Sequence, residues 1–239
     1  MCVATTTGSS KLGYDDLPEL LTRLTGDEKH DWSALSTLDA LWVLYDRVLR
    51  DGDRFLLSKG HGPAAYYAVL AAKGLIPVEL LDGFGEFDSP LGYHPDRNVA
   101  PGVEISSGSL GHGLAIAVGS ALAGSIGGQA ADARPETGPS PAGAGRRVFC
   151  LVGDAELEEG SNWEAVQFAG RVAAASLTAI VIDNNSSTYG WPRGIEQRFA
   201  LEGWAATRVD GRDHDALAEA LTPDPHETRP SCVVAQVTP

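Results

Sequence analysis

The chain has 239 residues, of which 43% are apolar, and a formal net charge of −14 at neutral pH. This length suits one α/β domain with a sizeable core, and the acidic balance disfavours non-specific binding to nucleic acid or to an anionic membrane. Because the chain starts without the pattern of a signal peptide and has no apolar run long enough to cross a bilayer, we expect a soluble, cytoplasmic protein with neither a nucleic-acid nor a membrane partner.

Three stretches in the first half of the chain have apolar residues at helical spacing, and they cover residues 34–49, 62–73 and 111–124. Gly74 would end the second of these helices, since glycine readily takes the left-handed conformation found after helix ends. The segment 83–111 is rich in glycine and proline and has no clear period, so it predicts long loops. Residues 1–15 are polar, and we expect them to be loose.

The second half of the chain predicts strands alternating with helices. Residues 127–147 are small, polar and rich in proline, and they predict a flexible loop inside the domain. Continuous apolar runs, typical of strands buried on both faces, cover residues 148–152, 177–182 and 232–237, and a helical pattern covers 162–175. Strand, helix, strand is the unit of a parallel sheet. We therefore predict a single α/β domain over residues 1–239, with a parallel sheet and helices on both faces.

The strongest chemical feature follows two of these predicted strands. Gly153-Asp154-Ala155-Glu156 leaves the first, and Asn184-Asn185 leaves the next. Ligands in open α/β sheets bind at the carboxyl ends of the strands, where a carboxylate and an amide oxygen suit Mg²⁺ together with phosphate and water. The helix that begins near Ser161 would favour the same anion. A helix cap at Asp154 or a turn at Asn184 explains either piece alone, but the pair favours a metal–diphosphate site.

These segments resemble the thiamine diphosphate fingerprint, in which Gly-Asp-Gly precedes a double asparagine. Further segments are similar to transketolases in particular, and they cover residues 57–74 (LSKGHGPAAYYAVLAAKG), 92–123 and 203–237. The resemblance extends over nearly the whole chain from about Ser33 onward. It implies the diphosphate-binding domain of the thiamine diphosphate-binding fold, with thiamine diphosphate and Mg²⁺ or Ca²⁺ as cofactors.

The resemblance also assigns roles by position in this sequence. It implies three metal ligands, namely Asp154, the side chain of Asn185 and the backbone carbonyl of Ser187. The residues expected at the cofactor itself are His61, Gly108, Leu110, Gly153 and Ala155, with Asn185 shared between metal and cofactor. Catalytic or site-coupling roles fall to four residues, namely His94, His30, His112 and Glu159.

The sequence departs from the transketolase pattern at several points. Asp31-Trp32-Ser33 replaces the Pro-Gly-Gly that usually follows the residue matching His30. Ala155 replaces the third glycine of the fingerprint, which costs on the order of 1 kcal/mol if the position needs a positive φ and nothing if it is helical. His112 stands where glutamine is usual, which predicts altered acceptor chemistry. The family's further histidine near the thiazolium ring is also missing, because the chain stops at Pro239.

The resemblance implies the N-terminal subunit of a split transketolase. The partner would be a C-terminal transketolase subunit carrying the pyrimidine-binding domain and its activating glutamate, in an α2β2 heterotetramer. The assembly would transfer a two-carbon ketol unit from a small-molecule ketose donor to an aldehyde or carrier-bound acceptor, in sugar-phosphate metabolism or in a specialised biosynthetic pathway. Two alternatives stay open: a subunit that decarboxylates 2-oxo acids, and a degenerate, non-catalytic partner protein with this fold.

Overall fold

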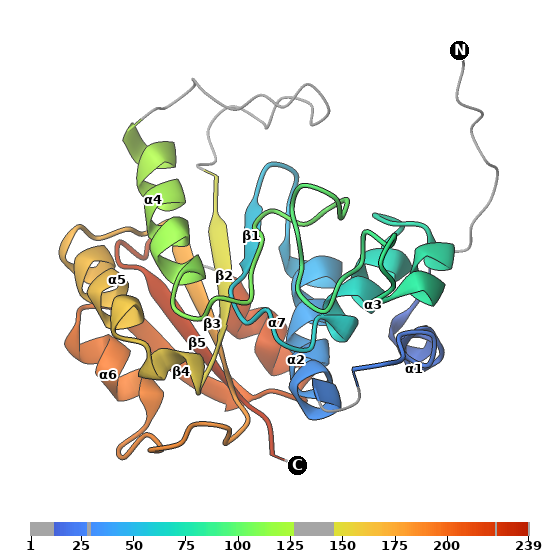
Figure 1. Ribbon diagram of the computed structural model, residues 1–239. Helices are drawn as coiled ribbons and strands as arrows, with labels where there is room; N and C mark the ends of the chain where they lie inside the picture. Colours follow the sequence, from blue (N-terminus) through green and yellow to red (C-terminus); the bar gives the residue numbers. More distant parts are fainter. Residues whose placement is uncertain (1–11, 28–29, 127–145, 223, 239) are drawn as a thin grey trace.

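The computed structural model describes residues 12–27, 30–126, 146–222 and 224–238. A five-stranded sheet with the order β1-β2-β3-β5-β4 forms its centre, and all four strand pairs are parallel (Figure 1). The strands are β1 (Arg54–Leu57), β2 (Val148–Gly153), β3 (Leu177–Asp183), β4 (Ala205–Asp210) and β5 (Ser231–Gln236). Since the strands are parallel, their carboxyl ends lie along one edge of the sheet.

Helices cover both faces of the sheet, as predicted (Figure 1). One face packs against α1 (Leu17–Leu21), α2 (Asp31–Val43), α3 (Ala64–Ala72) and α7 (His214–Leu221); the other packs against α4 (Gly113–Ile126), α5 (Gly160–Arg171) and α6 (Ile195–Leu201). Phe149 and Leu151 of β2 belong to the first core, and Cys150 and Val152 to the second. Both faces of the strand are therefore buried, which explains its uninterrupted apolar sequence.

The predicted elements are found within a few residues of their expected bounds. The helix expected over 34–49 is α2 followed by a π-helical turn, Leu44–Val48, and Gly74 after α3 has the left-handed φ of +69° that its role requires. Residues 84–112 contain no helix or strand, in agreement with the predicted loops. In the described parts of the chain, no helix is long and apolar enough to cross a membrane.

Two segments that we expected to be loose or flexible, residues 1–15 and 127–147, contain ordered residues at one end. Residues 1–11 and 127–145 lie outside the described ranges, but residues 12–15 pack on the domain, against expectation. The Tyr14 hydroxyl donates a 2.6 Å hydrogen bond to buried Asp39, which fixes this segment. Arg147, at the end of the predicted loop, is likewise held by an ion pair with Asp53, whose side chain is 6% exposed.

Candidate functional site

The segments that follow β1, β2 and β3 converge at the carboxyl edge of the sheet. Ser58 to His61 follow β1, Asp154 follows β2, and Asn184 to Ser187 follow β3. Parallel pairing in register aligns the three strand ends, because Leu57 lies beside Leu151 and Gly153 beside Ile182. Most of the residues singled out in the sequence therefore come from neighbouring strand ends or from loops packed against them.

Asp154 joins the ends of β2 and β3. Its side chain is fully buried, and one carboxylate oxygen accepts hydrogen bonds from the backbone N–H groups of Ser186 and Ser187 at 2.8 and 3.1 Å. The exposed residue Asn185, in the same loop, has a left-handed φ of +58°, a conformation that non-glycine residues adopt at a cost. The three predicted metal ligands, Asp154, Asn185 and Ser187, are thus brought to one place.

The Gly153–Ala155 turn shows the backbone conformation of Ala155 and the partners of the two N–H groups expected at the diphosphate. Ala155 has φ −67° and ψ −33°, so it is helical and alanine costs nothing there. The N–H groups predicted to bind the diphosphate are both paired inside the chain: that of Gly153 with Glu156 at 3.3 Å and that of Ala155 with Asp154 at 2.9 Å. Binding of a phosphate oxygen at either group would have to replace a carboxylate contact.

Glu156 is a functional candidate that sequence reasoning missed. Its buried carboxylate accepts hydrogen bonds from the Ser58 hydroxyl and from the N–H groups of Gly111 and Gly153. Ser58 in turn accepts a hydrogen bond from the Gly113 N–H at 3.0 Å. Burial raises the pKa of Glu156, although these hydrogen bonds act in the opposite direction. One carboxylate therefore ties together the loops after β1, before α4 and after β2.

Glycines let two of these loops approach closely. A Cβ atom on Gly60 would lie 2.4 Å from the backbone nitrogen of Gly108, and a Cβ on Gly108 would lie 2.4 Å from the ring of His94. Gly108 also has a left-handed φ of +120°. Neither position has room for a side chain, so Gly108 has a packing role beside His94. Leu110, the other residue expected at the cofactor ring, is half-buried in the same loop.

Three of the predicted histidines form a row. The ring centroids of His30 and His61 are 5.7 Å apart, and those of His61 and His94 are 5.1 Å apart, each pair in an edge-on arrangement. Burial of His61, together with its neighbours His94 and His30, lowers its pKa below the ordinary value. This residue therefore favours the neutral ring. The segment Asp31-Trp32-Ser33, which departs from the transketolase pattern, contacts the site, because the Ser33 hydroxyl donates a hydrogen bond to the His61 carbonyl at 3.0 Å.

The other two predicted catalytic residues lie outside this row. His112 is exposed just before α4, although its neighbours Gly111 and Gly113 are anchored by Glu156 and Ser58. Glu159 is exposed at the start of α5 and packs beside Gly111, where an added Cβ would meet its side chain at 2.9 Å. Both residues border the site, and the structure gives neither a contact with the three histidines.

Lys59 is a second functional candidate that the sequence reasoning did not single out. Its buried ammonium donates to the carbonyl of Ser33 at 2.7 Å and to the hydroxyl of the same residue, while its aliphatic stem passes over Gly153. Burial lowers the pKa of Lys59 to about 8, despite the nearby carboxylates of Asp154 and Glu156. Its position in the Ser-Lys-Gly-His segment was the available signal, since this segment lies in the stretch 57–74 that resembles transketolases and contains His61.

The residues at the strand ends fit a metal–diphosphate group. Their donor set is rich in oxygen, as Mg²⁺ and Ca²⁺ require. The buried Asn184 side-chain oxygen accepts no hydrogen bond from any described residue, and Lys59 supplies a buried cation beside Asp154. Within the described residues there is no cluster of three or more His, Cys, Asp or Glu side chains able to hold a metal. A metal here would therefore depend on amide and carbonyl oxygens as well as Asp154.

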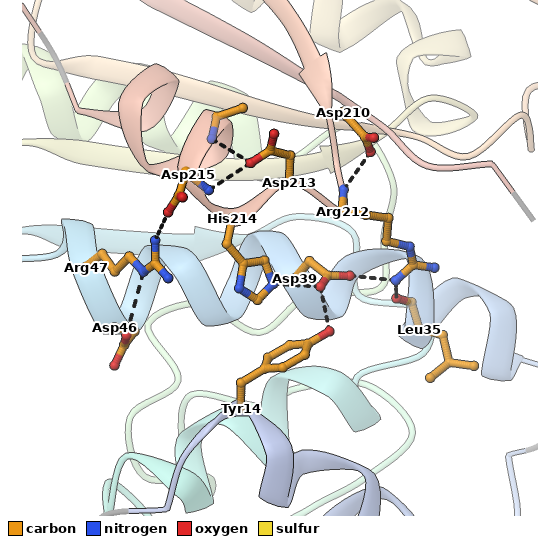
Figure 2. Close-up of polar contacts among 11 residues, drawn as sticks. Tyr14, Leu35, Asp39, Asp46, Arg47, Asp210, Arg212, Asp213, His214 and Asp215 are labelled. Atoms are coloured by element: carbon orange, nitrogen blue, oxygen red, sulfur yellow. Dashed lines mark hydrogen bonds and ion pairs between the residues drawn. The ribbon is translucent and has the colours of Figure 1, made fainter.

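A second polar cluster lies between α2, α7 and the N-terminal segment (Figure 2). Its residues line an open hollow of about 500 Å³. Its centre is buried Asp39, which pairs with Tyr14, Arg212 and His214. The outer charges also pair with each other, since Arg47 contacts Asp215 at 2.6 Å. Because the charges satisfy one another, this cluster holds the N-terminal segment and α7 onto α2. It shares no residue with the strand-end site.

Comparison with known proteins shows which family this chain resembles. The family model described as "Transketolase, thiamine diphosphate binding domain" matches residues 30–238. A protein of Rhodococcoides fascians named "Ferredoxin fas2" is 50% identical over 238 residues, which cover 96% of this chain and 73% of that protein. One of the subunits of the apulose-4-phosphate transketolase of Actinobacillus succinogenes is 32% identical over 224 residues, which cover 87% of this chain and 76% of that protein.

A solved structure has the same fold. The transketolase from Leishmania mexicana superposes with a TM-score of 0.74 and 26% sequence identity, over 95% of this chain. The match covers 37% of the Leishmania chain, so this chain corresponds to well under half of that protein.

Proposed function

Because the chain belongs to the transketolase family, as its thiamine diphosphate-binding domain, we propose that it is the cofactor-binding subunit of a ketol-transferring enzyme. The reaction is transfer of a two-carbon unit from a ketose donor to an aldehyde or carrier-bound acceptor. The observation that carries this proposal is that Lys59 links the Asp154 turn to the histidine row. Its stem passes over Gly153, its ammonium donates to Ser33, and the Ser33 hydroxyl donates to the His61 carbonyl. An anionic cofactor and a polyhydroxylated substrate both find suitable groups there.

The strand ends would hold the cofactor. Asp154, the Asn185 side chain and the Ser187 carbonyl would bind Mg²⁺ or Ca²⁺, which in turn binds the diphosphate. Lys59 and the start of α5 would add positive potential near the same anion. When bound, thiamine diphosphate supplies the carbanion chemistry that amino-acid side chains lack. The chain's own contribution is to place this cofactor against the histidine row.

The histidine row would bind and orient the sugar donor. Neutral imidazole rings offer both a hydrogen-bond donor and an acceptor, which suits adjacent hydroxyl groups. His61, whose pKa is lowered, would remain neutral at physiological pH, while the exposed ring of His94 would face the donor. His112, at the border of the site, would influence the acceptor rather than the donor.

The assembly proposed is a split transketolase. One relative is named as one of the subunits of a transketolase, and the match to the Leishmania transketolase covers only 37% of that chain. We infer a partner subunit that carries the remaining site residues, in an α2β2 arrangement. The electron-carrier function implied by the name of another relative is not proposed for this chain. Four-cysteine iron–sulfur clusters need one more cysteine than the three present, of which Cys150 and Cys232 are buried in strands.

The test is a ketol-transfer assay on the chain reconstituted with its candidate partner, thiamine diphosphate and Mg²⁺. The expected result is donor-dependent formation of a ketose two carbons longer than the aldehyde acceptor. A parallel reaction with 2-oxo acids distinguishes the first alternative, because release of CO₂ without ketol transfer indicates a decarboxylating subunit. Absence of both reactions, together with absence of cofactor binding, would identify the degenerate partner protein instead.

A further inference from the structure

Asp27 is a buried carboxylate beside the histidine row. Its side chain is 8% exposed, and its Oδ1 atom lies 2.7 Å from Nδ1 of His30. Its other oxygen, Oδ2, is buried and has no hydrogen-bond partner among the described residues. A buried charged oxygen without a partner is costly, and such an atom in a folded protein calls for an explanation. Among the described residues, the contact with His30 is therefore the one hydrogen bond that the Asp27 side chain makes.

This contact determines which nitrogen of His30 carries the proton. An ionised carboxylate can only accept hydrogen bonds, so Nδ1 of His30 must be the donor. In the neutral ring, Nε2 is then an unprotonated acceptor. The His30 side chain is 28% exposed, and no described residue forms a hydrogen bond with Nε2. Since the His61 ring lies 5.7 Å away, this free acceptor belongs to the histidine row.

We propose that Asp27 is a positioning residue that holds the proton of His30 on Nδ1, so that Nε2 accepts a hydrogen bond from a hydroxyl group of the sugar donor. The inference rests on the proposed function, because it requires a hydroxylated substrate beside His30, His61 and His94. Asp27 stands three residues before His30 and so approaches it from the first turn before α2. A carboxylate that fixes an imidazole tautomer in this way is a recurrent device in enzyme sites.

The tautomer can be measured without turnover. In the chain labelled with ¹⁵N-histidine, at a pH where His30 is neutral, we expect a protonated Nδ1 and an unprotonated Nε2, with the signal identified by its loss in His30→Gln. In Asp27→Asn the amide can donate to Nδ1, so the proton should move to Nε2. Asp31→Asn removes the same charge from an exposed neighbour and should leave the tautomer as in the wild type. A wild-type ring protonated on Nε2, or an unchanged tautomer in Asp27→Asn, would overturn the inference.

The role of the tautomer is tested in the reconstituted enzyme. Asp27→Asn should lower kcat/KM for the ketose donor by roughly 10²-fold, the range of a lost acid–base or acceptor group, without weakening cofactor binding. Asp31→Asn should keep the wild-type value. Asp27→Glu retains a carboxylate and should restore most of the activity, which separates this role from simple support of the fold. Unchanged kcat/KM in a folded Asp27→Asn enzyme with a switched tautomer would overturn the positioning role.

The two proposals fail in different ways. If the wild-type assembly transfers no ketol unit, the proposed function fails, whatever the tautomer of His30 is. If the wild type is active but Asp27→Asn changes neither the tautomer nor kcat/KM, the proposed function stands and the assignment of Asp27 falls.

Discussion

At the scale of single residues, Asp154 combines two tasks that a pair of variants can separate. It is the one carboxylate in the proposed metal site, and it also accepts the hydrogen bonds that hold Ser186 and Ser187 in place. Asp154→Ala removes both and should abolish Mg²⁺-dependent binding of thiamine diphosphate, measured by calorimetric titration of the assembled enzyme. Asp154→Asn keeps an acceptor for the loop but loses the charge, so it should fold like the wild type and still bind the cofactor poorly. Wild-type affinity in both variants would remove the site assignment.

Lys59 makes the stability of the unliganded chain depend on pH. Burial lowers its pKa to about 8, whereas an exposed lysine titrates near 10.5. Between these pH values the unfolded chain binds more protons than the folded chain, so the free energy of unfolding should rise with pH. The contribution is lost as the pH falls through 8. Urea denaturation from pH 8 to 10 should therefore show a steeper rise for the wild type than for Lys59→Met, and parallel curves would contradict the assignment.

At the scale of elements, Glu156 is the link between the loops that form the site. Glu156→Ala leaves the Ser58 hydroxyl and the N–H groups of Gly111 and Gly153 without their acceptor. An unpaired buried group costs about 1–3 kcal/mol, so we expect a loss of at least that size in the free energy of unfolding, measured by denaturant titration. Glu156→Gln retains one acceptor oxygen and should lose less. If Glu156→Ala is as stable as the wild type, the loops are held by other contacts.

The strands that could be predicted from the sequence are those whose burial is nearly complete. β2 and β3 are apolar along almost their whole length, because helices cover both faces, and they were predicted to within one residue. β1 has only four residues and starts with Arg54, so its pattern is too short to recognise. β4 lies at the sheet edge, where no residue is fully buried, and its sequence AATRVD carries no apolar run. A short strand such as β1 and a half-exposed strand such as β4 leave no clear period in the sequence.

The residues of the candidate site also divide into those that the sequence singled out and those that it missed. Asp154, His61 and His94 lie in long motifs, so the resemblance alone singled them out as candidates, and the structure places the rings of His61 and His94 5.1 Å apart. Lys59 and Glu156 were missed because a charged residue in a sequence is expected at the surface. Their burial arises only when separate loops meet, as Ser58, Gly111 and Gly153 do around Glu156. Tertiary partners of this kind cannot be read from spacing within one segment.

At the scale of the whole molecule, the domain carries two polar clusters with different purposes. The Asp39 cluster in Figure 2 is satisfied within the chain, since Tyr14, Arg212 and His214 all pair with its carboxylate. Among the described residues, two buried oxygens near the proposed site have no hydrogen-bond partner, namely the side-chain oxygen of Asn184 at the strand ends and Oδ2 of Asp27 beside the histidine row. This contrast supports a structural role for the first cluster and a ligand-binding role for the second, and it suggests that the site is completed from outside the chain.

If the site is completed from outside the chain, a partner subunit should be required for activity. The match covers 37% of the Leishmania transketolase chain, and a relative is named as a transketolase subunit, so we expect the 239-residue chain alone to be inactive. Mixing it with its candidate partner should give ketol transfer and a species containing two copies of each chain, detectable by analytical ultracentrifugation. The Asp154→Ala chain should assemble with the partner but remain inactive, which separates assembly from cofactor binding. Robust turnover by the purified wild-type chain would refute the two-subunit proposal, because the described site would then be sufficient without a partner.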